Sequence, residues 1–538
     1  MPQARPRTWR PDGWLALALA IAALVLIPVA VTLAAFAHPQ AELLAHLAEF
    51  VLPELVANTL WLGAGVAVGV GVIGVSLAWL TAVCEFPGRR FFNWALLLPL
   101  ALPAYVLGFV VIGLLDFSGP LQSALRAAFG PVVLPQIRSR FGVIVTLSLA
   151  LYPYVYLIAR NAFATQGAVA LEAAQSLGHS RRAGFFRVAL PMARPWIAAG
   201  VMLALMETLA DFGTMAVFNY DTFTTAIYKA WFSLFSLPAA AQLASILIAF
   251  VLAMVVIEQR SRAAMRYGAV GRAAHTRRIR LSGASAVLAS GWAGAVLTLA
   301  FIVPVTQLAL WALPILGEDL DARYWGFFRH SLVLAGSGAL LVVATSVLLA
   351  YAGRESRSPG MPWVQRVATL GYAFPGAVLA VGLYIPVAWL DNLLIDRFGA
   401  AAGVLKGSLV VMLLAYLVRF LAVGFGPVDS GLQRITRSID DAARSLGHTL
   451  RTRLARVHLP MLRASLVTAA TLTFVDIMKE MPITLMTRPF GWDTLAVRVF
   501  EMTSEGQWER AALPALAIVI AGIIPVMILT AHGDRAHG

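Results

Sequence analysis

The 538-residue sequence has few of the groups on which soluble enzymes depend. Only 13% of its residues are charged, whereas a soluble domain carries about 25%. Its single cysteine, Cys84, cannot form an internal disulfide, and with nine scattered histidines it gives no structural zinc pattern. The sequence contains no Gly-x-x-x-x-Gly-Lys-Ser/Thr loop, so we expect the chain to bind no ATP itself. We also expect no catalytic residues, no metal site and no bound cofactor.

The sequence is instead rich in long hydrophobic segments. Hydrophobic residues make up 60% of the chain, and runs of about 20 apolar residues, long enough to cross a bilayer, recur along it. We predict an all-α polytopic membrane protein with about twelve transmembrane helices, the first of them retained because it lacks a cleavage pattern. The expected spans are 13–36, 56–84, 92–115, 142–166, 193–218, 237–257, 284–313, 331–352, 367–389, 407–427, 463–487 and 511–531.

The basic residues fit a membrane protein better than a nucleic-acid-binding protein. The formal net charge is +14, but with these spans Lys and Arg gather in alternate connecting segments, as the positive-inside rule expects. We therefore predict no nucleic-acid partner, and we place both termini and a basic linker in the cytoplasm, next to anionic lipid heads.

One cytoplasmic segment occurs twice, 269 positions apart, as Gly178 and Gly447 illustrate. Its recurring elements are an acidic residue, Ala-Ala, Gly-His and a later Leu-Pro. The first copy comprises Glu172, Ala173, Ala174, Gly178, His179, Leu190 and Pro191, and the second Asp441, Ala442, Ala443, Gly447, His448, Leu459 and Pro460.

The duplication extends along the chain. Pro103 corresponds to Pro375 and Asn58 to His330 at an offset of 272, and Phe223-Thr224-Thr225 is aligned with Trp492-Asp493-Thr494 at 269. We predict two parallel six-helix units, 1–260 and 284–538, joined by a basic cytoplasmic linker at 261–283, with the duplicated loops at 167–192 and 436–461. Dense glycines in the second span (Gly63, Gly65, Gly69, Gly71 and Gly74) indicate close helix packing.

Each duplicated loop predicts a short helix, a bend and a second short helix. Glycine permits the bend at Gly178, and the alanines leave space for a partner surface. Because both ends join transmembrane helices, such a loop could transmit a push from a partner. The alternative is that both loops are connectors packed against their own protein.

These loops resemble the EAA loop of ABC importer permeases, with Asp441 in place of Glu172 in the second copy. The resemblance covers essentially the whole chain, as two fused permease units. It implies coupling helices that fit a cytoplasmic ATPase, which is homodimeric because this chain supplies both permease halves. It also implies ATP and Mg²⁺ on that ATPase, a periplasmic substrate-binding protein, and a place in the bacterial inner membrane.

Segments 207–214, 221–232, 476–482 and 488–498 resemble the fused permeases of ferric-iron importers, which implies iron as the substrate. Permeases for thiamine and other small solutes are similar enough to remain alternatives. A self-contained secondary transporter also fits twelve helices in two halves, but the duplicated loop is not expected in that class.

Ionisable residues within two equivalent spans are candidates for the translocation pathway. Glu207 and Asp211 are four residues apart and share a helix face, as do Asp476 and Glu480, with Lys479 beside them. Carboxylates suit a hard cation, so these groups could line its route between the halves. Structural ion pairs that hold the helices in register are the alternative.

Overall fold

The computed structural model describes residues 12–36, 45, 47–131, 134–265, 278–399 and 405–535. Most of the predicted linker, 266–277, and the side chain of Ala173 lie outside this part. The described chain is almost entirely helical, which confirms the all-α membrane class. Within it, ten helices are long and apolar enough to cross a membrane, or eleven if Leu450–Met461 and Arg463–Met478, bent by 74°, form one span.

The chain contacts divide it into two units that do not follow chain order. Unit 1 comprises Met1–Gln40, Ile227–Ser245 and Ala322–Val497, and unit 2 comprises Ala41–Ala226, Ile246–Asp321 and Arg498–Gly538. The first helix therefore packs with second-half helices, and the span at 284–319 packs with first-half helices. Composition and spacing gave no indication of this interleaving.

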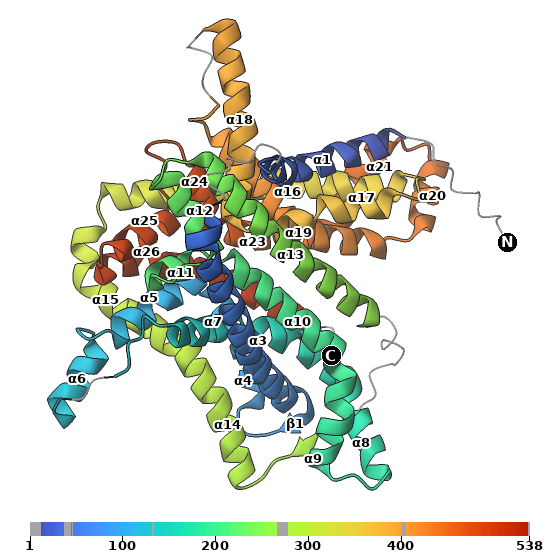
Figure 1. Ribbon diagram of the computed structural model, residues 1–538. Helices are drawn as coiled ribbons and strands as arrows, with labels where there is room; N and C mark the ends of the chain where they lie inside the picture. Colours follow the sequence, from blue (N-terminus) through green and yellow to red (C-terminus); the bar gives the residue numbers. More distant parts are fainter. Residues whose placement is uncertain are drawn as a thin grey trace. The chain divides into compact units, whose positions relative to one another are not determined.

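Unit 2 contains the first duplicated loop at one end of its bundle (Figure 1). Its helices and strands are α3 (Leu52–Val83), β1 (Cys84–Glu85), α4 (Arg89–Ala95), α5 (Ala104–Leu115), α6 (Pro120–Phe129), α7 (Arg140–Ala162), α8 (Ala168–Ser176), α9 (Arg181–Gly184), α10 (Leu190–Ala210), α11 (Gly213–Phe218), β2 (Ile279–Arg280), α14 (Ala284–Leu297), α15 (Val303–Asp319) and α26 (Trp508–Arg535). α12 (Phe223–Phe232) and α13 (Leu237–Met265) are divided between the units.

Unit 1 contains the second duplicated loop. Its helices are α1 (Gly13–Ala34), α16 (Ala322–Glu355), α17 (Met361–Ala368), α18 (Gly376–Phe398), α19 (Leu409–Arg434), α20 (Arg437–Ser445), α21 (Leu450–Arg453), α22 (Leu459–Met461), α23 (Arg463–Met478), α24 (Pro482–Thr487) and most of α25 (Leu495–Ser504). α1 packs against α16, α17 and α18, and Asp12 caps its first turn by accepting from the Leu15 amide at 2.7 Å.

Two predicted spans are broken in the same way. The expectation of a continuous helix over 92–115 is wrong: α4 ends at Ala95, a 3₁₀ turn follows at Leu98–Ala101, and α5 begins at Ala104. The span predicted at 367–389 breaks likewise into α17, a turn at Leu370–Ala373 and α18. Pro103 and Pro375 precede the second helix of each break with the same backbone angles, φ −56° and ψ 142°. Proline disfavours helix in the residue before it, which explains the repeated break.

Opposite ends of α16 carry different contacts. The helix has 34 residues, or about 51 Å, which exceeds the hydrocarbon thickness of a bilayer. Near its start, Ser331 Oγ accepts from the Leu495 amide at 2.9 Å, whereas its last residue, Glu355, contacts Arg453 of α21. The beginning of α25 and the second duplicated loop therefore lie toward opposite ends of α16.

The offset between the two halves of the repeat changes again before α12 and α25. Asn58 Nδ2 donates to the Asp221 carbonyl at 3.1 Å, and His330 Nδ1 lies 3.2 Å from the Asp493 carbonyl. α12 and α25 begin two residues after Asp221 and Asp493 respectively. The alignment of Phe223 with Trp492 is therefore wrong by three residues, because the second half has a longer loop before α25.

Three of the five glycines in α3 bring it close to α7. A Cβ at Gly65, Gly69 or Gly74 would lie 2.4, 2.0 or 2.7 Å from side-chain atoms of α7, whereas a Cβ at Gly71 would meet nothing within 4 Å. The prediction of close packing is therefore confirmed for these three positions. Gly63 is 3.8 Å from Leu205, which is ordinary contact.

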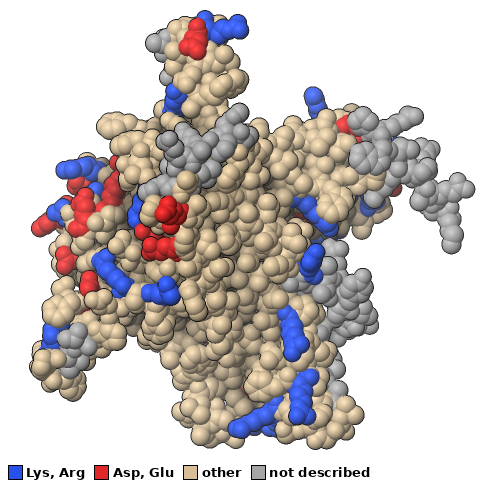
Figure 2. Space-filling view, viewed as in Figure 1, with Lys and Arg blue, Asp and Glu red and all other residues tan. Residues whose placement is uncertain are grey.

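Charged side chains are sparse on the visible surface, and broad faces carry none (Figure 2). At the end of unit 2 that holds α9, β1 and α14, Glu85 pairs with Arg89 at 3.0 Å and with Arg278 at 3.8 Å, while β1 and β2 form a short parallel ladder. Cys84 is buried there, and burial raises the pKa of its thiol to about 11. Its thiolate is therefore scarce at neutral pH.

Candidate functional site

The first duplicated loop is a helical hairpin closed at Gly178. After α8, the Gly178 amide donates to the Gln175 carbonyl at 2.9 Å and the His179 amide to the Ala174 carbonyl at 3.0 Å. Gly178 has φ +80°, a conformation that glycine adopts without steric cost. Ser180 then caps α9 by accepting from the Ala183 amide, and a π-helical turn at Phe185–Ala189 leads into α10.

The second loop repeats this geometry element by element. α20 has nine residues, like α8, and Gly447 has φ +77°. The Gly447 and His448 amides donate to Arg444 and Ala443 at 2.9 and 3.0 Å, and Thr449 caps α21. A π-helical turn at Leu454–His458 again follows. The sequence prediction of a helix, a glycine bend and a second helix is confirmed in both copies.

The residues of the two hairpins divide into exposed and buried sets. Glu172, Asp441 and Ala442 are exposed, as are the bend glycines. Ala174 and Ala443 are buried instead, at 1% and 5% exposure, so they face their own hairpin rather than a partner. In the first copy a Cβ at Gly184 would lie 3.2 Å from the Ala174 Cβ, which shows why a small residue stands there.

The remaining predicted loop residues belong to the path back into the membrane. His179 and His448 follow the bend with partly buried side chains. Leu190 and Leu459 begin α10 and α22, and Pro191 and Pro460 occupy the first turn, where the missing amide hydrogen is tolerated.

An exposed leucine before each bend was not among the predicted site residues. Leu177 is 79% exposed and Leu446 is 77% exposed, at the same offset of 269. An exposed apolar side chain in this position on each hairpin is available to a partner groove. The signal was present in the sequence, because Ser-Leu-Gly-His recurs in both copies.

The second hairpin is attached to its bundle through a buried cluster of charged groups. Asp440, which is 4% exposed, accepts from Arg354 Nε at 2.9 Å, and its other oxygen lies 2.7 Å from His458 Nε2. Burial alone would raise the pKa of Asp440, but hydrogen bonds and charge from Arg354, with His458, outweigh it and lower that pKa. The resulting stabilisation is present at neutral pH and is lost as the pH falls through the depressed pKa.

The first hairpin is attached through aromatic rings. Trp79 of α3 packs against Phe163 and Phe185 with ring centroids 5.2 and 4.6 Å apart. Leu171, the residue equivalent to Asp440, is 3% exposed beside Gly184. Two loops of the same backbone geometry are thus joined to their bundles by different chemistry.

Two of the proposed pathway carboxylates cap equivalent short helices. Asp211 accepts from the Thr214 amide at 2.7 Å and the Thr214 hydroxyl at 2.9 Å at the start of α11. Glu480 accepts from the Ile483 amide at 3.2 Å at the start of α24, and Arg419 Nε lies 4.0 Å away. These contacts give both groups a local structural partner, and their role in a pathway stays a prediction.

The other three proposed pathway groups lie one turn earlier or beside the cap. Lys479 Nζ pairs with Asp476 at 3.0 Å, and both side chains are about one quarter exposed. Glu207 is partly buried in α10. Among the described residues, no three His, Cys, Asp or Glu side chains are grouped to hold a metal ion.

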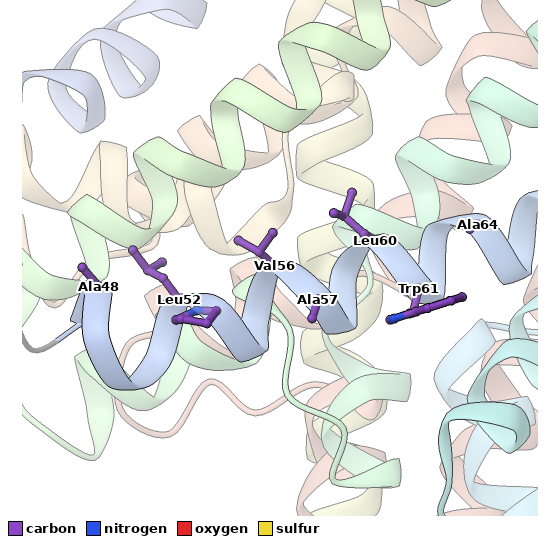
Figure 3. Close-up of a pocket in the computed structure, with 8 residues that line it drawn as sticks. Ala48, Leu52, Val56, Ala57, Leu60, Trp61 and Ala64 are labelled. Carbon is purple, nitrogen blue, oxygen red and sulfur yellow. The ribbon is translucent and has the colours of Figure 1, made fainter.

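An apolar groove follows the first turns of α3 (Figure 3). It has a volume of about 770 Å³ and is lined by Ala48, Leu52, Pro53, Val56, Ala57, Leu60, Trp61 and Ala64. None of these described lining residues is charged, so the groove suits acyl chains rather than a hydrated ion.

Comparison with known proteins identifies the family. Residues 71–266 and 343–537 each match the family described as binding-protein-dependent transport system inner membrane component. The chain belongs to this family. It is a fused permease with two copies of the family domain, as the duplicated loops indicated.

Similar permeases include two that are named for iron. The Fe(3+)-transport system permease protein FbpB 2 of Haemophilus influenzae is 27% identical over 492 residues, covering 90% of this chain and 91% of the relative. The ferric transport system permease protein FbpB of Actinobacillus pleuropneumoniae is 23% identical over 79% of this chain and 63% of its own length. A Salmonella paratyphi A permease protein, PhnV, assigned to 2-aminoethylphosphonate transport, is 32% identical over 39% of this chain and 74% of its own length.

Proposed function

We propose that this permease moves ferric iron into the cytoplasm, driven by a homodimeric cytoplasmic ATPase that binds ATP and Mg²⁺. The observation that carries the coupling role is the matched pair of hairpins, each with an exposed leucine before a glycine of positive φ. Two equivalent surfaces on one chain fit the two equivalent grooves of a symmetric ATPase dimer.

Iron as the cargo is supported by a relative named for Fe(3+) transport that matches 90% of this chain. A periplasmic binding protein would deliver it to the face opposite the hairpins, with both termini and the linker in the cytoplasm. Glu207, Asp211, Asp476 and Glu480 would give a passing cation a weakly negative route, with Lys479 moderating the field next to Asp476.

A small organic solute is the second candidate, and the similarity to PhnV favours it specifically. Reconstitution into proteoliposomes with the ATPase and candidate binding proteins tests both. We expect ATP-dependent uptake of radiolabelled ferric iron and none of 2-aminoethylphosphonate or thiamine. Uptake of either organic solute instead would reject iron, and uptake without the ATPase would reject the coupled importer altogether.

A further inference from the structure

Among the described residues, the positions beneath the first hairpin that correspond to the buried charged cluster of the second hold uncharged residues. We propose that Arg354, Asp440 and His458, with Glu355 and Arg453, form a positioning clamp that makes α20 move together with the cytoplasmic end of α16. This inference rests on the proposed coupling function of the hairpins.

Arg354 is the centre of the clamp because it joins its own helix, α16, to two other elements. Its Nε and Nη2 lie 2.9 and 2.8 Å from Asp440 Oδ2 in α20. Its Nη1 donates to the Leu432 carbonyl at 2.8 Å and its Nη2 to the Ile435 carbonyl at 2.9 Å, at the end of α19. The guanidinium holds its donors in a fixed plane, so these bonds set the orientation of α20 as well as its distance.

A second pair binds the other arm of the hairpin to the same helix. Arg453 Nη2 of α21 lies 3.2 Å from one oxygen of Glu355 and 3.3 Å from the other. The side chains of Arg453 and Glu355 are only 4% and 12% exposed, so water screens the pair little. Both arms of the hairpin are therefore attached to the last turn of α16.

His458 completes the cluster from the π-helical turn that leads back to the membrane. Its side chain is fully buried, and its Nε2 lies 2.7 Å from Asp440 Oδ1. Its ring also packs on Tyr351 of α16, with centroids 5.4 Å apart. Asp440 is thus held on both oxygens.

The first hairpin shows that these charges are not needed to form the fold. The residues equivalent to Asp440, Arg453 and His458 are Leu171, Gly184 and Ala189, and all three are buried. Ala82 stands where the offset of 272 places the equivalent of Arg354. The same hairpin conformation forms in the first copy with apolar groups at these positions. The directional bonds of the second copy therefore attach the hairpin to α16 and are not what gives it its shape.

The test uses the reconstituted transporter and measures substrate moved per ATP hydrolysed. We expect Asp440→Asn and Arg354→Lys to lower this ratio about 3-fold to 30-fold while assembly with the ATPase and its hydrolysis rate are maintained. His458→Gln keeps a hydrogen-bond donor to Asp440 and should retain the ratio better than His458→Leu. Asp429→Asn is the matched control, because its carboxylate lies on α19 and bonds Gln433 at 2.7 Å rather than the clamp.

Two results would overturn the clamp. One is an unchanged ratio in the variants at Arg354, Asp440 and His458. The other is a parallel fall of assembly, hydrolysis and transport, which indicates a merely structural role. If Asp440→Asn does not accumulate, the comparison of His458→Gln with His458→Leu decides. Gly447→Leu in the same membranes distinguishes failure of the clamp from failure of the coupling function. If Gly447→Leu uncouples transport and the clamp variants do not, only the clamp is rejected. If Gly447→Leu transports normally, the coupling function itself is rejected.

Discussion

The double variant Gly178→Leu, Gly447→Leu should uncouple the ATPase from the permease while leaving the chain inserted. Both glycines have positive φ, +80° and +77°, and a Cβ added at either would meet nothing within 4 Å. The damage is therefore conformational and not a clash inside the protein. A non-glycine residue in this region costs about 1–2 kcal/mol, so both bends together cost about 2–4 kcal/mol. If docking requires both bends, the affinity for the ATPase dimer should fall about 30-fold to 1000-fold.

The assay is pull-down of the ATPase by permease in nanodiscs, with transport measured on the same preparation. Asparagine tolerates positive φ, so the double asparagine variant should bind nearly as well as the wild type. Gly506→Leu is the matched control, because Gly506 has φ +74° with nothing within 4 Å of an added Cβ and lies outside both hairpins. Its amide and that of Gln507 donate to the Thr503 and Met502 carbonyls, as the Gly178 and His179 amides do to Gln175 and Ala174. Wild-type assembly and transport in the double leucine variant would refute the reasoning, and an equal loss in Gly506→Leu would show that general destabilisation explains it.

Three further predictions follow from the same structure. A cysteine at Ser180 should react with an impermeant maleimide only from the cytoplasmic side, and labelling from the periplasmic side would reject the proposed orientation. Glu207→Gln should lower iron flux more than protein abundance, whereas Glu480→Gln should lower protein abundance because Glu480 also caps α24. If Glu207→Gln lowers flux and abundance in parallel, Glu207 has a structural role. Gly69→Leu should destabilise the chain by about 1–3 kcal/mol in chemical denaturation, whereas Gly71→Leu, whose Cβ faces open space, should not; equal effects would refute the packing argument.

Local chemistry explains why the hairpins could be predicted from the sequence. Glycine at a helix end, a hydroxyl residue two positions later and proline at the next helix start each act within one turn. The same signals recur 269 residues apart, so each copy supports the other. The breaks at Pro103 and Pro375 were missed because hydrophobicity continues through them, and the apolar run outweighed the prolines in the span assignment.

Contacts between distant residues explain what could not be predicted. Arg354 and Asp440 are 86 positions apart, and although the repeat aligns Asp440 with the apolar Leu171, that alignment does not identify Arg354 as the partner of Asp440. The caps at Asp211 and Glu480 depend on the chain turning directly after α10 and α23, which composition does not reveal. The longer loop before α25 could not be located from the sequence either. The bonds from Asn58 to the Asp221 carbonyl and from His330 to the Asp493 carbonyl show which residues of the two halves correspond.

The placement of α1 has a consequence for biosynthesis. Its contacts with α16, α17 and α18 form late, because these helices begin at Ala322, which is 288 positions after Ala34, whereas Ser245 of α13 is made earlier and donates to the Thr32 carbonyl at 2.6 Å. At about 5–20 residues per second, α1 waits about 15 to 60 seconds in the bilayer before α16 exists. During that time lipid must cover the face that later packs against α18, where Gly382 closely approaches the Pro28 carbonyl. A cell that makes this permease therefore has to keep an early helix incompletely packed, and unrecognised by membrane proteases, until α16, α17 and α18 have followed.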